Sequence, residues 1–107
     1  MNNLMGAVYI LYSPVADKFY IGSTKKLSSR IEYHKNKSFP GSFTTRYADW
    51  ELFFQIDNLE IGVARKIESH LKRMKSRMYI KNLRRYPEIS QKLIDKYNLL
   101  ADDRDNK

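Results

Sequence analysis

The sequence feature that most constrains the fold is a pair of short apolar segments near the N-terminus, followed by an amphipathic one. Residues 7–12 are apolar or aromatic throughout, which is typical of a strand covered on both faces. Ser13–Asp17 contains proline and aspartate and predicts a turn, and residues 18–22 alternate as a returning strand does. Antiparallel pairing would bring Tyr9 and Tyr20 onto one face if the register is favourable.

The next segment predicts a helix that Ser23 or Thr24 can cap. At 3.6 residues per turn, one arc of about 100° holds Leu27, Arg30, Ile31 and His34. The two aliphatic residues direct this arc toward the sheet, so a guanidinium and an imidazole share the buried side. Because an unpaired buried charge is costly, we expect Arg30 to meet either a carboxylate or a bound phosphate.

The second half of the chain predicts one more strand and further helices. Residues 36–49 form a long loop, and its aromatic residues either stack on bases or, as we favour, pack over the sheet edge: Phe39, Phe43 and Tyr47. Trp50, Leu52, Phe54 and Ile56 alternate with other residues as in a half-buried strand, which Asp57-Asn58 ends.

The helix expected from about Leu59 has an apolar stripe made of Ala64, Ile67, Leu71, Met74 and Met78. A break near Ser76 would start a second short helix, and Pro87 suits the first turn of a last helix over residues 87–99. We expect Ile89, Leu93 and Tyr97 to be its buried residues. Residues 101–107 are charged and predict a disordered tail.

Length, charge and cysteine content narrow the class of protein. A chain of 107 residues predicts one domain, over residues 1–100 with its core at about 7–85. The absence of cysteine excludes a disulfide scaffold and a thiolate zinc site and fits a cytoplasmic location. No apolar run approaches the roughly 18 residues of a membrane span. A formal charge of +8 favours a nucleic-acid partner over mere solubility or an anionic membrane surface.

Several motifs recur here at the spacing of a known family. Val8-Tyr9-Ile10 and Tyr20-Ile21-Gly22 lie on the first two strands, and Arg30 precedes His34 by four residues. Together with residues 64–68, which end in Glu68, they resemble the GIY-YIG nuclease domain over about residues 7–85, most of all its small stand-alone members. The first motif departs from Gly-Ile-Tyr, and Tyr9 takes the place of its tyrosine.

The resemblance implies an α+β fold with a three-stranded, largely antiparallel sheet flanked by helices. It also implies a metal-dependent endonuclease site on one sheet face, whose catalytic residues are Tyr9, Tyr20, Arg30, His34 and Glu68. Some members carry a lysine where this chain has Ser23, and Asn82 matches a late asparagine of the family only approximately; for both, a structural role is favoured.

The chemistry of these residue types fits phosphodiester hydrolysis. Glu68 is a hard oxygen ligand for one Mg²⁺ or Mn²⁺ ion, with water and phosphate completing the shell. Arg30 offers a planar fork for a phosphate oxygen. Tyr9, Tyr20 and His34 would position the attacking water and take its proton, with Tyr9 favoured by analogy and the choice of base left open.

Plainer interpretations compete with this one. Each of the five residues, taken singly, is more often structural, and Glu68 pairs naturally with Lys72 at i+4 on a helix. The chain would then be a nucleic-acid-binding module without useful turnover, or a basic domain that docks on an acidic protein. In the nuclease and the nucleic-acid-binding interpretations we expect DNA rather than RNA to contact Lys72, Lys75, Arg77, Arg84 and Arg85.

Overall fold

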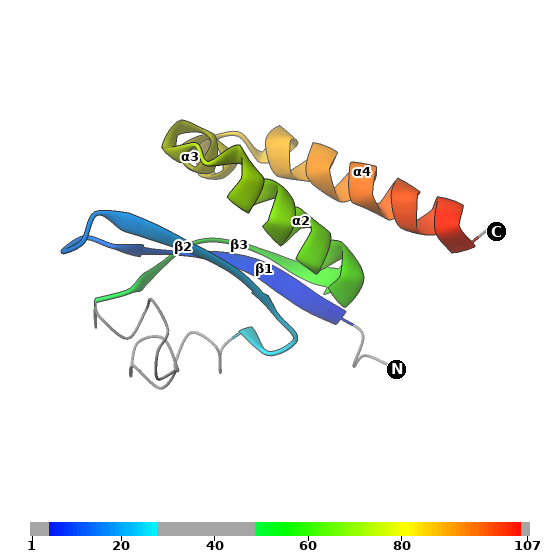
Figure 1. The fold of residues 1–107 in the computed structure, drawn as a ribbon, viewed down its shortest axis with the longest axis horizontal. Coiled ribbons are helices and arrows are strands. Elements are labelled where there is room, and N and C mark those ends of the chain that lie inside the picture. Colours follow the sequence, from blue (N-terminus) through cyan, green and yellow to red (C-terminus); the bar gives the residue numbers. More distant parts are fainter. Residues whose placement is uncertain (1–4, 28–48, 106–107) are drawn as a thin grey trace.

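A computed structural model describes residues 5–27 and 49–105 of the chain, with side chains to residue 99. In chain order its elements are β1 (Met5–Ser13), β2 (Lys18–Thr24), β3 (Glu51–Glu60), α2 (Ile61–Met74), α3 (Arg77–Arg85) and α4 (Pro87–Asp105). The strands form one antiparallel sheet in the order β2-β1-β3, and the three helices lie over one face of it (Figure 1). The predicted α+β fold with a three-stranded antiparallel sheet is confirmed.

The turn between β1 and β2 is held by side chains as well as by the backbone. The Asp17 amide donates to the Ser13 carbonyl at 2.7 Å, and Asp17 adopts a φ of 54°, which aspartate tolerates better than most residues. The Asp49 carboxylate accepts from the Ser13 hydroxyl at 2.7 Å and from the Val15 amide at 2.8 Å. These bonds lower the pKa of Asp49 and tie the predicted turn to the residues that precede β3.

β1 is the central strand, and it is buried on both faces as its composition predicts. In the β1–β2 register Tyr9 lies opposite Gly22, and Leu11 lies opposite Tyr20. Directly opposed residues of an antiparallel pair share a face. Tyr9 and Tyr20 therefore lie on the same side of the sheet, as expected for a favourable register.

The third strand is confirmed, and Phe54 and Ile56 share a face as predicted, but Trp50 and Leu52 lie on the other face. A register irregularity opposite Ile10 and Leu11 shifts the pairing of β3, as a β-bulge does. Trp50 consequently joins the cluster on the face opposite α2, whereas Ile56 belongs to the core under α2, α3 and α4. The strand also continues beyond Asp57-Asn58 to Glu60, with Asn58 at a φ of 58°.

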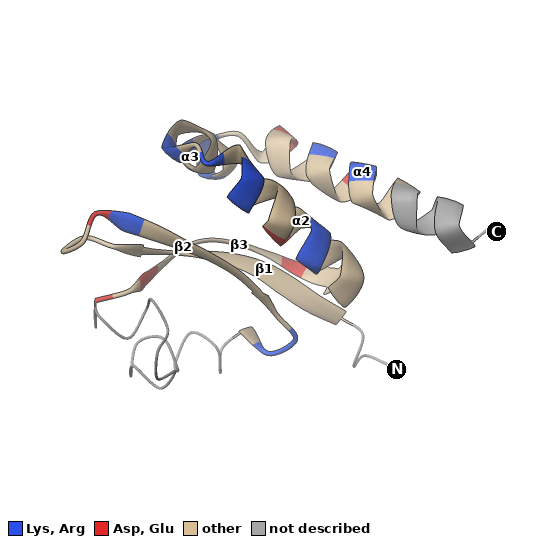
Figure 2. Ribbon diagram, in the orientation of Figure 1, with Lys and Arg blue, Asp and Glu red and all other residues tan. Residues whose placement is uncertain are grey.

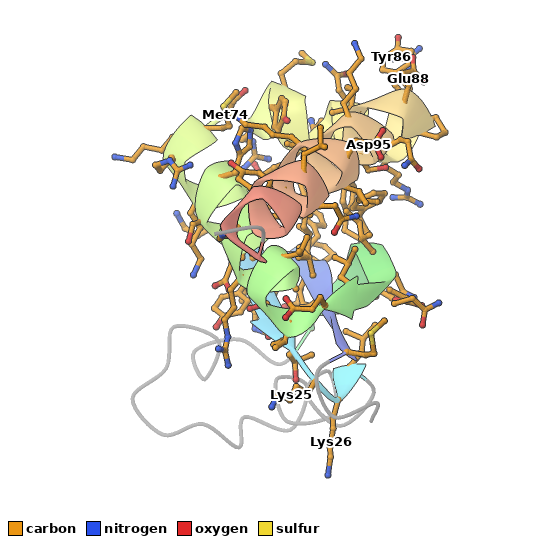
Figure 3. The ribbon with its side chains drawn as sticks, turned by 90° about the vertical axis from the view of Figure 1, so that its right-hand side faces the viewer. Lys25, Lys26, Met74, Tyr86, Glu88 and Asp95 are labelled. Carbon is orange, nitrogen blue, oxygen red and sulfur yellow. The ribbon has the colours of Figure 1, made fainter. Side chains whose placement is uncertain are left out.

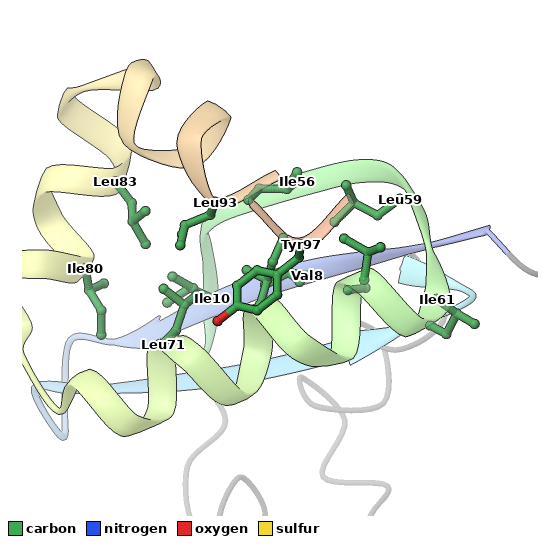
Figure 4. Packing of buried hydrophobic residues seen from close by; sticks show 13 residues of the cluster. Val8, Ile10, Ile56, Leu59, Ile61, Leu71, Ile80, Leu83, Leu93 and Tyr97 are labelled. Atoms are coloured by element: carbon green, nitrogen blue, oxygen red, sulfur yellow. The ribbon is translucent and has the colours of Figure 1, made fainter. Parts of the chain in front are cut away.

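The main core lies between the sheet and the helices (Figure 4). α2 starts at Ile61 rather than near Leu59 because the Glu60 side chain accepts from the amides of the first turn. Its stripe buries Ala64, Ile67 and Leu71 as predicted. Met74 and Met78 are 43% and 66% exposed, so their predicted place in the stripe is wrong.

Short breaks at residues 75–76 and at residue 86 separate α2, α3 and α4. Ser76 caps α3 by accepting from the Tyr79 amide at 3.1 Å, which confirms the break expected there. α4 starts at Pro87 and buries Leu93 and Tyr97. It continues to Asp105, so its backbone is helical well beyond residue 99 and into the segment predicted to be a disordered tail. No helix in the described ranges is long and apolar enough to cross a membrane.

Candidate active site

Two tyrosines lie together on the sheet face that points away from α2. Tyr9 is 1% exposed and packs in a small cluster with Leu11 and Trp50, against which Tyr20 also rests. The ring centroids of Tyr9 and Tyr20 are 6.3 Å apart, and those of Tyr20 and Trp50 are 6.4 Å apart. The phenols are thus held in place by packing against their neighbours.

Gly22 explains how Tyr9, on the central strand, reaches the edge of the sheet. A Cβ atom built at Gly22 would lie 2.5 Å from the Tyr9 hydroxyl and 2.6 Å from Cζ of its ring. Only a residue without a side chain leaves room for the ring to cross β2 there. The glycine of the Tyr-Ile-Gly motif therefore places the Tyr9 hydroxyl over the edge strand.

Glu68 lies on the other side of this strand. Its Oε1 accepts from the Ser23 hydroxyl at 2.5 Å, and its Oε2 is 2.6 Å from the Lys72 ammonium. Ser23 pairs with Val8, which belongs to the core under the helices, so Glu68 is on the helix side of the sheet. The expectation of a site confined to one sheet face is wrong, because Tyr9 and Tyr20 lie on the opposite face.

The edge of β2 is where the two sides approach one another. A groove of about 310 Å³ runs between β2 and the junction of α2 and α3. It is lined by Phe19, Tyr20, Ile21, Leu71, Lys72, Lys75, Ser76, Arg77 and Ile80. Tyr20 from one face and the cations of α2 from the other therefore border the same groove.

The predicted phosphate contacts divide into two groups. Lys72, Lys75 and Arg77 line this groove, and Lys72 also pairs with Glu68. Arg84 lies instead over the Phe53 ring on β3, with its Cζ 4.8 Å from the ring centroid, and Arg85 lies over Tyr86. The basic segment is therefore not one continuous track, and Arg84 and Arg85 are not brought to the groove.

Arg77 also has a structural role in the groove wall. Its guanidinium donates to the Asp17 carbonyl at 2.9 Å and to the Asp17 carboxylate at 2.7 Å, and it lies over the Phe19 ring. The pKa of Asp17 is lowered by the hydrogen bond from the Tyr12 hydroxyl and by Arg77. α3 is thus fastened to the β1–β2 turn at one end of the groove.

The remaining predicted site residues fall outside the described ranges. Arg30 and His34 belong to residues 28–48, as do the loop aromatics Phe39, Phe43 and Tyr47. The helix predicted to carry Arg30 and His34 falls mostly there too. Thr24, one of the two residues expected to cap it, accepts through Oγ1 from the Lys26 amide at 3.0 Å, but this bond lies before the helix and does not test the cap.

The donor set around Glu68 is compatible with one hard divalent ion. Within residues 5–27 and 49–99 no three acidic or histidine side chains gather into a metal cage. Mg²⁺ needs only one or two carboxylates when water and phosphate supply the other ligands. The Glu68 side chain is 20% exposed, and a cation, the Lys72 ammonium, already lies against its Oε2.

Ser23 is the site residue that sequence reasoning missed. The sequence favours a structural role for it, but its hydroxyl holds the Glu68 carboxylate. Strand periodicity contained the signal, because Ser23 shares its face with Phe19 and Ile21, which alternate with Tyr20. A hydroxyl on the core side of an edge strand is able to orient a helix carboxylate above it.

A comparison with protein families matches the GIY-YIG catalytic domain over residues 5–84. Comparisons with curated proteins and with solved structures gave no match. GIY-YIG domains are endonuclease domains that act on nucleic acid and generally use divalent metal ions. Because the match spans most of the 107 residues, the chain belongs to the GIY-YIG family.

Proposed function

We propose that this chain is a metal-dependent endonuclease that hydrolyses DNA phosphodiester bonds at the edge of β2. The observation that carries the proposal is the position of Glu68. It meets Ser23 and Lys72 beside a basic groove, and Tyr20 borders that groove from the other face of the sheet. A sugar-phosphate backbone lying along an edge strand can contact groups from both faces.

Each residue has a role that follows from its chemistry. Glu68 holds one Mg²⁺ or Mn²⁺ ion, with Ser23 orienting its carboxylate. When bound, such an ion stabilises negative charge on the departing 3′-oxygen. Arg30 binds a non-bridging phosphate oxygen, while Tyr9, Tyr20 and His34 position the attacking water. One of these three accepts the proton of the water, and Tyr9 can do so only after its own phenolic proton has passed to His34 or to a metal-bound hydroxide.

The Lys72 ammonium has two possible partners in this site, the Glu68 carboxylate and a phosphate group. It pairs with Glu68 here at 2.6 Å while its side chain is 54% exposed. An exposed i,i+4 pair contributes only about 0.3–0.5 kcal/mol, so exchange of the ammonium for a divalent ion costs little. Released from Glu68, Lys72 remains in the groove as a partner for phosphate.

A plasmid-nicking assay with Mg²⁺ or Mn²⁺ tests the proposal. Glu68→Gln retains the shape of the side chain and an acceptor for Ser23 but removes the charge, and we expect nicking to fall by about 10²–10³-fold, as for loss of one electrostatic group. Glu51→Gln, at an exposed position on β3, is the matched control and should nick like wild type. Wild-type activity in Glu68→Gln would exclude the metal role of Glu68.

The second candidate is a nucleic-acid-binding module without useful turnover. The observation that favours it is that both Glu68 oxygens already have protein partners. In that case DNA affinity falls steeply with salt, while no divalent ion supports nicking by wild type. The preference for DNA rests on membership of the family, and the cytoplasmic location rests on the lack of cysteine.

A further inference from the structure

The outward face of α2 carries cations, and all of them except Lys72 lie outside the groove beside β2. At 100° per residue, an arc of about 120° contains in order Lys72, Arg65, Ser69, Arg73 and Lys66. One end of the arc adjoins Glu68, and the other faces α4. Figure 2 shows basic residues at two places along α2 and again on α4.

The α4 end of this arc is hollowed. A pocket of about 310 Å³ is lined by Arg65, Lys66, Ser69, Arg73 and Tyr97, and it shares no residue with the groove beside β2. Lys96 adds a fourth cation, since its Nζ lies 5.3 Å from the centre of the Tyr97 ring. The Tyr97 side chain is held in place, because its hydroxyl is 3.1 Å from Nδ1 of His70.

These cations have no acidic partner in the described part of the chain. The ion pairs among the described side chains are Lys72–Glu68 and Arg77–Asp17, and neither involves Arg65, Lys66 or Arg73. The pKa of His70, beside the pocket, is lowered by burial and then by Lys96 and Arg73. Positive charge is therefore concentrated here without an ion-paired carboxylate among the described side chains.

We propose that this pocket and the outer face of α2 bind backbone phosphates of a nucleic acid, as an anchoring surface separate from the cleavage groove. Arg65 and Arg73 are two turns apart, about 12 Å along the helix at 1.5 Å per residue. That spacing suits a regularly repeating anion, which one strand offers at about 3.4 Å per phosphate along its axis. Guanidinium groups match phosphate oxygens with paired hydrogen bonds. The inference rests on the proposed function only for the identity of the ligand.

Binding of a fluorescent DNA duplex, followed by anisotropy in EDTA over a series of salt concentrations, tests this without cleavage. In the double variant Arg65→Gln/Arg73→Gln, we expect the slope of log K against log salt to become shallower by about 1.8, at roughly 0.9 per phosphate contact. That loss corresponds to about thirtyfold weaker binding at 0.15 M salt relative to a 1 M reference. Glutamine keeps helix propensity, and circular dichroism checks the fold.

The matched control removes two charges elsewhere. Lys18→Gln/Lys26→Gln alters exposed lysines near the two ends of β2, and Figure 3 shows Lys26 far from the helices. We expect its slope to change by less than half of one contact. An equal change in both double variants would overturn the inference, because the effect would then be one of net charge.

Two further outcomes are decisive. If poly-glutamate of equal charge displaces the duplex as well as unlabelled DNA does, the surface fits an acidic protein and the nucleic-acid assignment is overturned. If wild type nicks DNA but Arg65→Gln/Arg73→Gln keeps the full salt slope, this inference fails and the proposed function stands. If the slope becomes shallower as expected but wild type never nicks DNA, the anchoring surface stands and the proposed function fails.

Discussion

Substitution of Gly22 by alanine should destabilise the fold, because the Tyr9 ring occupies the space that the new methyl group needs. The added methyl would lie 2.5 Å from the Tyr9 hydroxyl and 3.0 Å from Cε1, well inside contact distance. The ring cannot move aside easily, because it is 1% exposed and packs with Leu11 and Trp50. Overpacking of this kind costs about 1–3 kcal/mol.

The effect of Gly22→Ala on the free energy of unfolding should vanish or reverse when Tyr9 is shortened. Tyr9→Leu removes the hydroxyl, Cζ and Cε1 atoms that meet the new methyl. Alanine is then better than glycine in a strand by roughly 0.5–1 kcal/mol, so Gly22→Ala becomes neutral or stabilising. The two substitutions are therefore coupled by at least about 1 kcal/mol, within the range found for residues in contact.

Urea unfolding of the four proteins in this cycle measures the coupling. With m of about 2 kcal/mol per M for a small domain, Gly22→Ala should lower the midpoint by roughly 0.5–1.5 M in the wild-type background and not at all beside Tyr9→Leu. Equal shifts in both backgrounds would show that the ring does not occupy the space above Gly22. In that case Gly22 would not be the residue that lets Tyr9 reach the sheet edge.

Two further predictions concern the helices. Ser76→Ala should cost about 1 kcal/mol because it removes the cap of α3, which lowers the melting temperature by about 4–8 °C; Ser76→Asp, which can still cap, should lower it far less. The pKa of His70 is depressed, chiefly by burial, so the unfolded chain binds the proton more readily and stability falls as pH drops below about 6.5. Urea midpoints at pH 7, 6 and 5 should fall less in His70→Gln than in wild type, and parallel curves would contradict this.

Several strands, turns and helix starts were predictable from the sequence because the relevant signals are local. The continuous apolar run of β1 indicates a strand buried on both faces, and Ser13–Asp17 contains the residues of its turn. Pro87 and Ser76 likewise mark helix starts through their own backbone chemistry. Each of these signals is contained within a few residues and needs no knowledge of the partner segment.

The errors came where a partner decides the outcome. The bulge in β3 depends on its pairing with Ile10 and Leu11. The sequence pattern therefore placed Trp50 and Ile56 on one face of the sheet, whereas they lie on opposite faces. Lys75 ends α2 with a φ of 50°, although glycine would have been the usual signal for such a stop. Without that signal, the predicted stripe continues to Met78.

The placement of the candidate site follows from the position of β2 at the edge of the sheet. Its consecutive residues point in alternate directions: Tyr20 toward the phenol cluster, Ile21 into the core, and Ser23 toward Glu68. Gly22, between Ile21 and Ser23, has no side chain and lets Tyr9 cross from the central strand. The prediction that all candidate residues share one sheet face fails, because side chains on both faces of an edge strand are close to that edge. Once β2 is known to lie at the edge of the sheet, residues from its two sides can border one groove, as Tyr20 and Lys72 do.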